Sequence, residues 1–411
     1  MSELTVSVIV VSRNRPDALR RCLLGVSQLQ YRPFEVVVVA CPEGIKVAEA
    51  ADSLADIKCV AFDAANISAA RNLGLVHAAG EIVAFIDDDA VPEPQWLRYL
   101  VAPAKCSDVA AMGGYVRGRN GISFQYRARS LDAQGTPQEL DIDSLQATVL
   151  IPPKGRAIKT EGTNMAFRRD VLVSIGGFDP AFRFYLDETD VNMRLARAGH
   201  ATALVPLAQV HHGFAASATR RADRVPRDLF EIGASWAVFQ RKHIPPREHA
   251  AHWHAQRAAE RQRLLAHMVA GGLESRDVRR LLKSLLAGYA EGQTRKPSAA
   301  RLPKHAVQPF RPANASSRRS GFTAVRGLRG TAALKKASES VHSGGIETVL
   351  ILSWTALFHR VTFSPQGVWV QKGGLFGKAA RDEPVFRLTS FGRRSKLERE
   401  RFELVRGLPD P

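Results

Sequence analysis

Residues 81–89 read EIVAFIDDD, an apolar run that ends in three consecutive aspartates. An apolar run of this length predicts a strand that is covered on both faces, as strands of parallel sheets are. The carboxyl ends of such strands form the edge where open α/β sheets bind their ligands. We therefore expect Asp87, Asp88 and Asp89 to lie at a ligand-binding edge.

Similar runs precede this one, at residues 6–12 (VSVIVVS), 34–40 (FEVVVVA) and 57–62 (IKCVAF). Between the first two, Pro16 suits the first turn of a helix, and an apolar stripe follows at the spacing of a helix. Strands that alternate with helices predict an α/β fold with a mostly parallel sheet flanked by helices.

The pattern changes towards the carboxyl end of the chain. The last helix whose apolar face can still belong to the core ends near residue 245, so residues 1–245 are the predicted main domain, with a mobile loop at residues 130–159. We expect a basic helical extension at 246–293 and a flexible basic linker at 294–346, which is rich in Pro, Ser, Ala and Gly. Residues 347–411 alternate around a turn at 364–367 and predict a small β-rich module.

Composition excludes several classes of protein. The chain has 411 residues, of which 45% are hydrophobic, as in ordinary globular proteins with buried cores. No apolar run approaches the roughly 18 residues that span a bilayer, and the N-terminal stretch lacks the features of a signal peptide, so a cytoplasmic location is expected. Four cysteines without a CxxC spacing argue against zinc-ribbon and thioredoxin-like proteins.

Positive charge is concentrated in the second half of the chain. Residues 1–215 hold 22 Lys and Arg against 24 Asp and Glu, and residues 216–411 hold 36 against 16. A basic half attracts polyanions, either nucleic acid or an anionic membrane surface. Nucleic acid is disfavoured because no helix-turn-helix, zinc-finger or RNA-binding signature is present. The simpler interpretation is a solvated helical extension, and the other is contact with the inner membrane face.

Two acidic clusters are candidates for chemistry. Three adjacent carboxylates repel one another, and a Mn²⁺ or Mg²⁺ ion would relieve this at Asp87–Asp89; the alternative is an acidic turn that caps the next helix. Asp187, Glu188 and Asp190 begin a predicted helix, where acids are favoured by the helix dipole. The functional alternative for this second cluster is a general base held at the edge of the sheet.

Two histidines and an arginine complete the candidate set. His211 and His212 follow a predicted strand, and we expect one to be structural and the other to offer an imidazole to the cation. Arg71 lies on a predicted helix, where it either pairs with an acid or grips a phosphate.

Three long segments carry a resemblance to a known family: VSVIVVSRNRPDALRRCL, NISAARNLGLVHAAGEIVAFIDDDAVPEPQWL and EGTNMAFRRDVLVSIGGFDPAFRFYLDETDVNMRLARAGH. With the late histidine, in this order, they resemble the family 2 glycosyltransferases, which have the GT-A fold. The resemblance covers about residues 5–215. It implies metal-dependent transfer of a sugar, with inversion, from a nucleotide diphosphosugar to a hydroxyl of a glycan, a lipid-linked sugar or another envelope component.

The resemblance also implies roles for individual residues. It places the donor against Arg71, Asp87, Asp88 and Glu43. It places the acceptor against Gly176, Gly177 and Phe178. It places the metal ion at Asp89 and one of His211 and His212. It makes the second acid of the pair Asp187 and Glu188 the catalytic base.

Two positions depart from the family pattern. Glu188 stands where the family usually has Asp, so the base either reaches further or its role passes to Asp187. Residues 40–43 read ACPE where the family has an Asp that helps hold the nucleobase, and Glu43 is the candidate substitute.

Two other classes compete with this interpretation. A dehydrogenase is disfavoured because the first strand is followed by SRNRPD and not by a G-x-G-x-x-G turn. The remaining alternative is a catalytically impaired polyanion- or membrane-binding protein built on a nucleotide-binding α/β domain.

Overall fold

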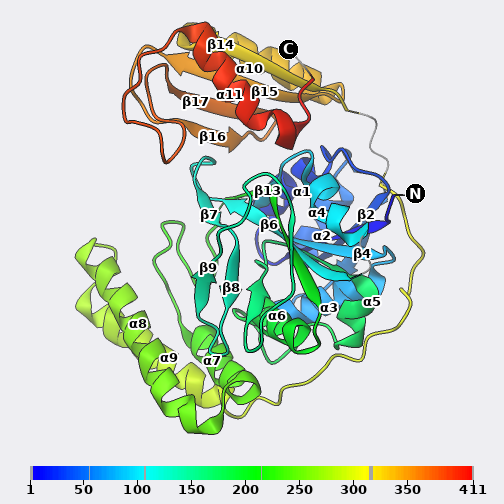
Figure 1. Ribbon diagram of the computed structural model, residues 1–411, viewed down its shortest axis with the longest axis vertical. Helices are drawn as coiled ribbons and strands as arrows, with labels where there is room; N and C mark the ends of the chain where they lie inside the picture. The colour runs from blue at the N-terminus through cyan, green and yellow to red at the C-terminus, as the bar shows by residue number, and fades with distance from the viewer. Residues whose placement is uncertain (1–2, 55, 106–107, 214, 314–317, 410–411) are drawn as a thin grey trace.

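The computed structural model describes residues 3–54, 56–105, 108–213, 215–313 and 318–409. A large sheet with helices on its faces lies at the centre (Figure 1). A long helical hairpin extends from one side, and a small module formed by the last part of the chain packs against one end of the central domain. In the described part of the chain, no helix combines the length and the apolar character needed to cross a membrane.

Ten strands form the large sheet: β1 (Val6–Ser12), β2 (Phe34–Ala40), β3 (Lys58–Ala61), β4 (Ile82–Asp87), β5 (Ala90–Pro92), β6 (Val109–Arg117), β7 (Phe124–Tyr126), β10 (Thr148–Leu150), β12 (Asn164–Arg168) and β13 (Ala201–His212). Their order is β10-β13-β6-β12-β4-β1-β2-β3, with β5 paired to β13 and β7 to β6. Neighbouring strands among β1, β2, β3 and β4 are parallel, as are β6 and β13, whereas β12 is antiparallel to both its neighbours. The predicted fold class is confirmed.

Helices cover both faces of this sheet: α1 (Pro16–Val26), α2 (Pro42–Glu49), α3 (Ile67–His77), α4 (Trp96–Val101), α5 (Arg169–Ser174) and α6 (Asp187–Arg197). Helix α1 begins with Pro16, as expected for a residue whose missing N–H is not needed there. Helix α3 begins after Asn66, whose side chain accepts a hydrogen bond from the Ala69 N–H. The sequence therefore fixes where these helices start.

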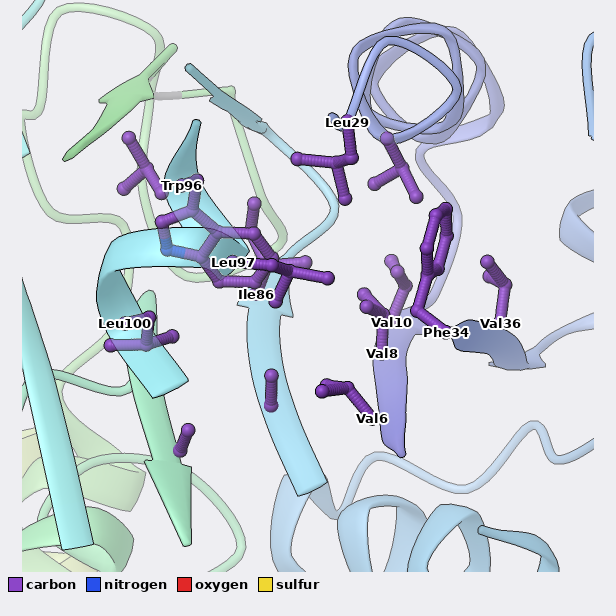
Figure 2. Packing of buried hydrophobic residues seen from close by; sticks show 14 of the residues in the cluster. Val6, Val8, Val10, Leu29, Phe34, Val36, Ile86, Trp96, Leu97 and Leu100 are labelled. Atoms are coloured by element: carbon purple, nitrogen blue, oxygen red, sulfur yellow. The ribbon is translucent and has the colours of Figure 1, made fainter. Parts of the chain in front are cut away.

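Two clusters of buried apolar side chains, one on each face of the sheet, pack the helices against it. Because side chains alternate along a strand, Val8 and Val10 of β1 point to one face and Ile9 points to the other. The first face packs against α1 and α4, where Trp96 and Leu97 fill the core (Figure 2). Each such buried side chain contributes about 1.5–3 kcal/mol to folding, so the strands are held rigidly and can position residues at their ends.

Residues 130–159, expected to be a mobile loop, contain regular structure. Strands β8 (Arg129–Leu131), β9 (Pro137–Glu139) and β11 (Ala157–Lys159) form a second, three-stranded sheet, and β10 pairs with the edge strand β13 of the large sheet. The strands are only three residues long and mostly polar, so their sequences carry no clear alternation.

The helical part after the central domain agrees with expectation. Helices α7 (Phe230–His243), α8 (His249–Val269) and α9 (Ser275–Gly292) follow one another, and α8 and α9 form the hairpin. Leu264 of α8 packs with Leu281 and Leu285 of α9, which supplies an apolar seam for an otherwise charged pair.

The predicted flexible linker at 294–346 is wrong for its second part. Residues 294–313 run as extended chain along the central domain, but strand β14 (Ser320–Arg326) and helix α10 (Gly330–His342) lie between 318 and 346. They belong to the carboxyl-terminal module with β15 (Ile346–Ser353), β16 (Arg360–Phe363), β17 (Trp369–Gly374) and α11 (Phe391–Arg406). Its sheet has the order β14-β15-β17-β16. Small residues and lysines dilute the periodicity of β14 and α10, and residues 314–317 lie outside the described part.

Candidate functional site

The aspartates that follow β4 point in two directions. Asp87 is the last residue of β4, and Asp88 and Asp89 form the turn into β5. Strand β5 pairs with β13 so that Ala90 lies opposite His212. This register brings ligand atoms of Asp87, Asp89 and His212 within 4.8 Å of one another. Two carboxylates and an imidazole suit a divalent cation such as Mn²⁺ or Mg²⁺, with the imidazole favouring Mn²⁺.

Asp89 is held as a carboxylate. Its Oδ1 lies 3.3 Å from His212 Nε2, and its Oδ2 accepts a hydrogen bond of 2.8 Å from the Ala215 N–H. Burial acts to raise its pKa, but His212, Arg15 and the Ala215 N–H together lower the pKa of Asp89 well below its usual range. The side chain is therefore charged at neutral pH, as a metal ligand has to be.

The Asp88 side chain faces the interior of the domain. Its carboxyl is fully buried, accepts a hydrogen bond of 2.7 Å from Ser12 Oγ and pairs with Arg15 at 2.6 Å. Burial raises the pKa of Asp88 to about 7, against the effect of Arg15. Its expected donor-binding role is therefore corrected, because the alternation of side chains points it at the turn between β1 and α1 and fastens that turn.

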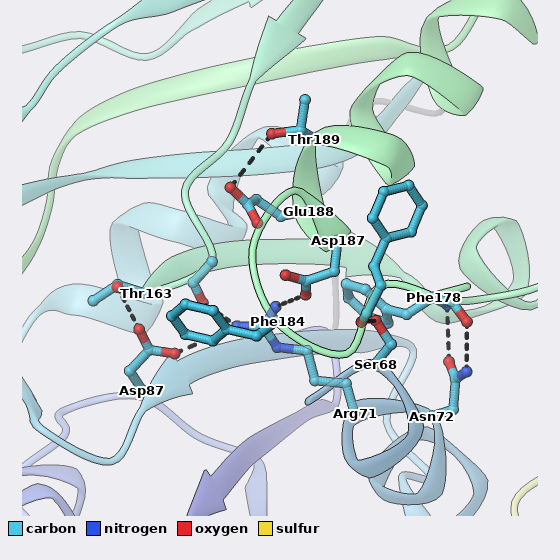
Figure 3. Close-up of polar contacts among 12 residues, drawn as sticks. Ser68, Arg71, Asn72, Asp87, Thr163, Phe178, Phe184, Asp187, Glu188 and Thr189 are labelled. Atoms are coloured by element: carbon cyan, nitrogen blue, oxygen red, sulfur yellow. Dashed lines mark hydrogen bonds and ion pairs between the residues drawn. The ribbon is translucent and has the colours of Figure 1, made fainter. Parts of the chain in front are cut away.

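Arg71 joins the two acidic clusters (Figure 3). Its guanidinium pairs with Asp187 and lies 3.3 Å from Asp87 Oδ1, and it donates a hydrogen bond of 3.1 Å to the Gly162 carbonyl. The second oxygen of Asp87 accepts a hydrogen bond of 2.5 Å from Thr163 Oγ1. Residues about 100 positions apart in the sequence thus lie in one site, and Arg71 is buried between them.

Asp187 and Glu188, although adjacent, have different surroundings. Asp187 is buried against Arg71, and burial raises the pKa of its carboxyl while Arg71 opposes that shift. Glu188 Oε1 accepts a hydrogen bond of 2.6 Å from Lys159 Nζ, on β11. Burial acts to raise its pKa, but Lys159 lowers the pKa of Glu188 to about 2. Glu188 is thus an ionised carboxylate at the edge of the same site.

His211 does not join this group, which corrects one of the two candidates for the metal ligand. Its Nε2 lies 2.7 Å from Glu93 Oε1, and its ring packs on Trp369 of the carboxyl-terminal module with 4.9 Å between centroids. Burial lowers the pKa of His211, against the effect of Glu93. Neighbouring residues of a strand point to opposite faces, so only one of the two histidines could face Asp89.

Gly176, Gly177 and Phe178 also lie elsewhere than expected. Gly176 and Gly177 have φ of +83° and +63°, and Ala299 and Leu302 of the extended chain cover them. Phe178 is fully buried and meets the rings of Phe85 and Phe167 edge to face. The expected acceptor role is therefore corrected: this is a covered turn that glycine permits, followed by a core residue.

One expected residue, Glu43, remains to be placed, and several residues at the site were not expected. Glu43 is exposed in the first turn of α2, and its donor-binding role stays a prediction. Sequence reasoning missed Ser12, Arg15, Lys159 and Thr163. Ser12 is the last residue of β1 and Arg15 follows it, and β1 is next to β4 in the sheet, so their position at the binding edge was a usable signal.

The sequence from residue 4 to residue 230 matches the family described as "Glycosyltransferase like family 2". The chain belongs to this family. An O-antigen biosynthesis protein of Myxococcus xanthus is 27% identical to this glycosyltransferase over 54% of the chain and 18% of the relative. A glucosyl-dolichyl phosphate glucuronosyltransferase of Haloferax volcanii is 27% identical over 43% of the chain and 56% of the relative. The matches thus span less than two thirds of these relatives.

Among solved structures, a mannosyltransferase of Pyrobaculum calidifontis in complex with GDP-Man and Mn²⁺ aligns with a TM-score of 0.40 and 18% identity. The alignment covers 72% of this chain and 88% of that one.

Proposed function

We propose that this glycosyltransferase transfers a sugar from a nucleoside diphosphosugar to an acceptor hydroxyl with inversion at the anomeric carbon. The observation that carries the proposal is the grouping of Asp87, Asp89 and His212 within 4.8 Å, joined through Arg71 to the second acidic cluster. This single site combines groups that suit a cation with a carboxylate that accepts a proton. The alternative of an impaired binding protein is disfavoured because these groups are all present and lie together.

Asp87, Asp89 and His212 would hold the divalent cation, Mn²⁺ or Mg²⁺, beside the diphosphate of the donor. When bound there, the cation supplies Lewis-acid stabilisation of the charge that develops on the departing diphosphate. Arg71 keeps Asp87 and Asp187 oriented, and Thr163 fixes the second oxygen of Asp87. Arg15, paired with Asp88 and Asp89, holds the turn that carries these acids.

Glu188 acts as the base in this mechanism. The acceptor oxygen forms a bond to the anomeric carbon as the bond to the diphosphate breaks, and Glu188 takes the hydroxyl proton. One displacement inverts the anomeric carbon and needs no covalent enzyme intermediate. Lys159 keeps Glu188 ionised before the acceptor arrives, and such a base contributes about 10²–10⁴ in rate.

The partners follow from the same chemistry. The donor is a nucleotide sugar, and the acceptor is a glycan or a lipid-linked sugar, as polymer assembly at a cell envelope requires. The transfer takes place in the cytoplasm, with contact at the inner membrane face for lipid-linked acceptors. One of the relatives is an O-antigen biosynthesis protein, which supports this class of acceptor.

The test compares single carboxylate changes in an otherwise folded protein. We expect Asp89→Asn and Glu188→Gln to reduce turnover of a panel of nucleotide sugars by about 10²-fold or more, and chelation of divalent cations to abolish it. Asp52→Asn, at an exposed acid in the turn that follows α2, is the matched control. Thermal unfolding of each variant separates lost catalysis from lost folding.

Two outcomes would contradict the proposal. Wild-type turnover in both variants would remove Asp89 and Glu188 from the chemistry. A product whose anomeric configuration equals that of the donor, read from the proton coupling constant, would exclude inversion. A thermal-shift panel of nucleoside diphosphates with Mn²⁺ identifies the base of the donor, because a ligand that binds the folded state stabilises it.

A further inference from the structure

Three loops of the carboxyl-terminal module end at one edge of its sheet. Strands β14, β15 and β17 are neighbours and parallel, so the loops that follow them, 327–329, 354–359 and 375–390, leave the sheet at the same side. In Figure 1 these loops form the left-hand end of the module. Backbone hydrogen bonds join two of them, from the Phe376 N–H to the Thr355 carbonyl and from the His359 N–H to the Lys378 carbonyl. We call this surface the aromatic edge.

The aromatic edge exposes an unusual amount of apolar surface. Seven large apolar side chains on these three loops are each more than half exposed: Leu328, Trp354, Leu357, Phe358, Val385, Phe386 and Leu388. The rings are held in place, since Phe376 contacts both Trp354 and Phe386. Apolar residues scattered singly over a surface are ordinary, but a cluster on one edge marks a site of interaction.

Basic side chains border the same surface. Arg326 lies over the rings of Trp354 and Phe391, at 5.4 and 5.5 Å from their centroids, and Arg329, Arg381 and Arg387 are exposed on the loops themselves. Asp382 is the exposed acid on these loops, within the described residues. Over residues 318–409 there are 17 Lys and Arg against 7 Asp and Glu. The surface is therefore apolar at its centre and positive at its border.

We propose that the aromatic edge docks this glycosyltransferase on an anionic lipid surface. Tryptophan and phenylalanine are suited to the interface between lipid tails and headgroups, and arginines next to them bind headgroup phosphates. Leucine and valine gain by entering the acyl region, whereas they offer no face on which nucleic-acid bases stack. A second copy of the chain would bring the same positive border against itself, because a two-fold contact is self-complementary.

The edge is connected to the candidate catalytic site through the chain. The loop 354–359 leads directly into β16 at Arg360, and Arg360 lines the same cavity as Asp89 and His212. Docking at the aromatic edge therefore brings the part of the module that lines this cavity towards the lipid surface. The proposal rests on the proposed function and deepens it, since it names the surface that makes the membrane contact and the lipid chemistry that this surface recognises.

Vesicle binding of the full chain tests the proposal. We expect the protein to sediment with phosphatidylcholine vesicles that contain phosphatidylglycerol, and more weakly with pure phosphatidylcholine or at high salt. Leu357→Ser with Phe358→Ser should lower the partition coefficient by about tenfold or more. Ile151→Ser is the matched control, since Ile151 is at least as exposed but lies on the central domain. Arg381→Gln with Arg387→Gln should remove the preference for anionic lipid.

Tryptophan fluorescence gives a direct readout of the edge. Trp354 is exposed, whereas Trp96, Trp236 and Trp369 are buried and Trp253 is half-buried and stacked on Tyr289. Brominated lipids should quench the wild-type emission, and Trp354→Phe should lose that quenching while it still binds vesicles.

Three results would overturn the proposal. They are no sedimentation with anionic vesicles at low salt, equal binding by the edge and control variants, or a dimer that the edge variants dissociate without any vesicle binding. Turnover of nucleotide sugar in solution is measured for every variant. Normal turnover with lost vesicle binding identifies a docking defect, whereas vesicle binding without turnover of any nucleotide sugar by the wild type points instead to a failure of the proposed function.

Discussion

Lys159 controls the charge of the candidate base. Its ammonium lies 2.6 Å from Glu188 and also donates to Thr189 Oγ1, and it is the largest influence that lowers the pKa of Glu188 to about 2. Removing the positive charge leaves burial to raise the pKa of the carboxyl. A larger fraction of Glu188 is then protonated, and unable to accept a proton, at any given acidic pH.

We therefore predict that Lys159→Met moves the acidic limb of the pH–rate profile to higher pH. The measurement is turnover of the nucleotide sugar from about pH 4 to about pH 9, where an acidic limb reports the pKa of the essential base. The wild-type pKa of about 2 puts the wild-type limb below this range, so a limb that appears within the range in the variant marks the shift. Lys154→Met, at an exposed lysine five residues earlier, should leave the limb in place. An unchanged profile in the Lys159 variant, with the fold intact, would mean that another group accepts the proton.

The site residues that could be predicted from the sequence are those whose position follows from the pattern of strands. Asp87, Asp89 and His212 lie at strand ends, and alternation alone shows that neighbouring side chains face opposite ways. The sequence could not tell whether His211 or His212 faces Asp89, because that depends on how β5 pairs with β13 and on where Trp369 packs. Lys159 and Glu188 meet through β11 of the second sheet, whose three residues are too few to show a periodic pattern.

At the level of elements, the extended chain 294–313 acts as part of the fold. Arg169 donates hydrogen bonds to the carbonyls of Lys304 and Pro303, and the Arg311 N–H donates to Glu35. Ala299 lies against Gly176. Composition predicted a linker because this segment has no periodicity, yet extended chain needs none when the surface it crosses accepts its hydrogen bonds. The strands β1, β2 and β4 were predictable because each is mostly apolar and almost fully buried.

The contact at Gly176 can be measured with two matched glycines. Gly176 and Gly199 both have positive φ, of +83° and +77°, but only Gly176 has the extended chain, at Ala299, where a Cβ would lie. We expect Gly199→Ala to lower the free energy of unfolding by about 1–2 kcal/mol through backbone strain alone. Gly176→Ala should lower it further, because Ala299 has to move. Equal losses in chemical denaturation would mean that the chain 294–313 does not pack there in solution.

At the scale of the whole molecule, a buried ion pair joins the module to the central domain. Arg406 of α11 donates hydrogen bonds of 2.9 and 3.1 Å to the two oxygens of Glu93, and both side chains are fully buried. The Arg406 guanidinium also lies over the ring of Trp369, which is fully buried as well. Glu93 also contacts His211, the neighbour of His212, so the pair lies directly behind the candidate metal site. Breaking a buried pair on one side leaves an uncompensated charge, at a cost of about 3–5 kcal/mol.

Glu93 should therefore make stability depend on pH. Burial acts to raise its pKa, but Arg406 and His211 lower the pKa of Glu93 from 4.5 to about 2. A carboxyl whose pKa is depressed by folding binds fewer protons in the folded state, so its contribution to the stability of the fold is complete above about pH 4.5 and is lost as the pH falls towards 2.

We predict that Arg406→Met lowers the melting temperature at neutral pH far more than Arg393→Met, at an exposed arginine of the same helix. The double variant Glu93→Gln with Arg406→Met should recover part of that loss and show a shallower fall of melting temperature below pH 4.5 than the wild type. Parallel curves for the double variant and the wild type would mean that the pair does not join the two parts in solution.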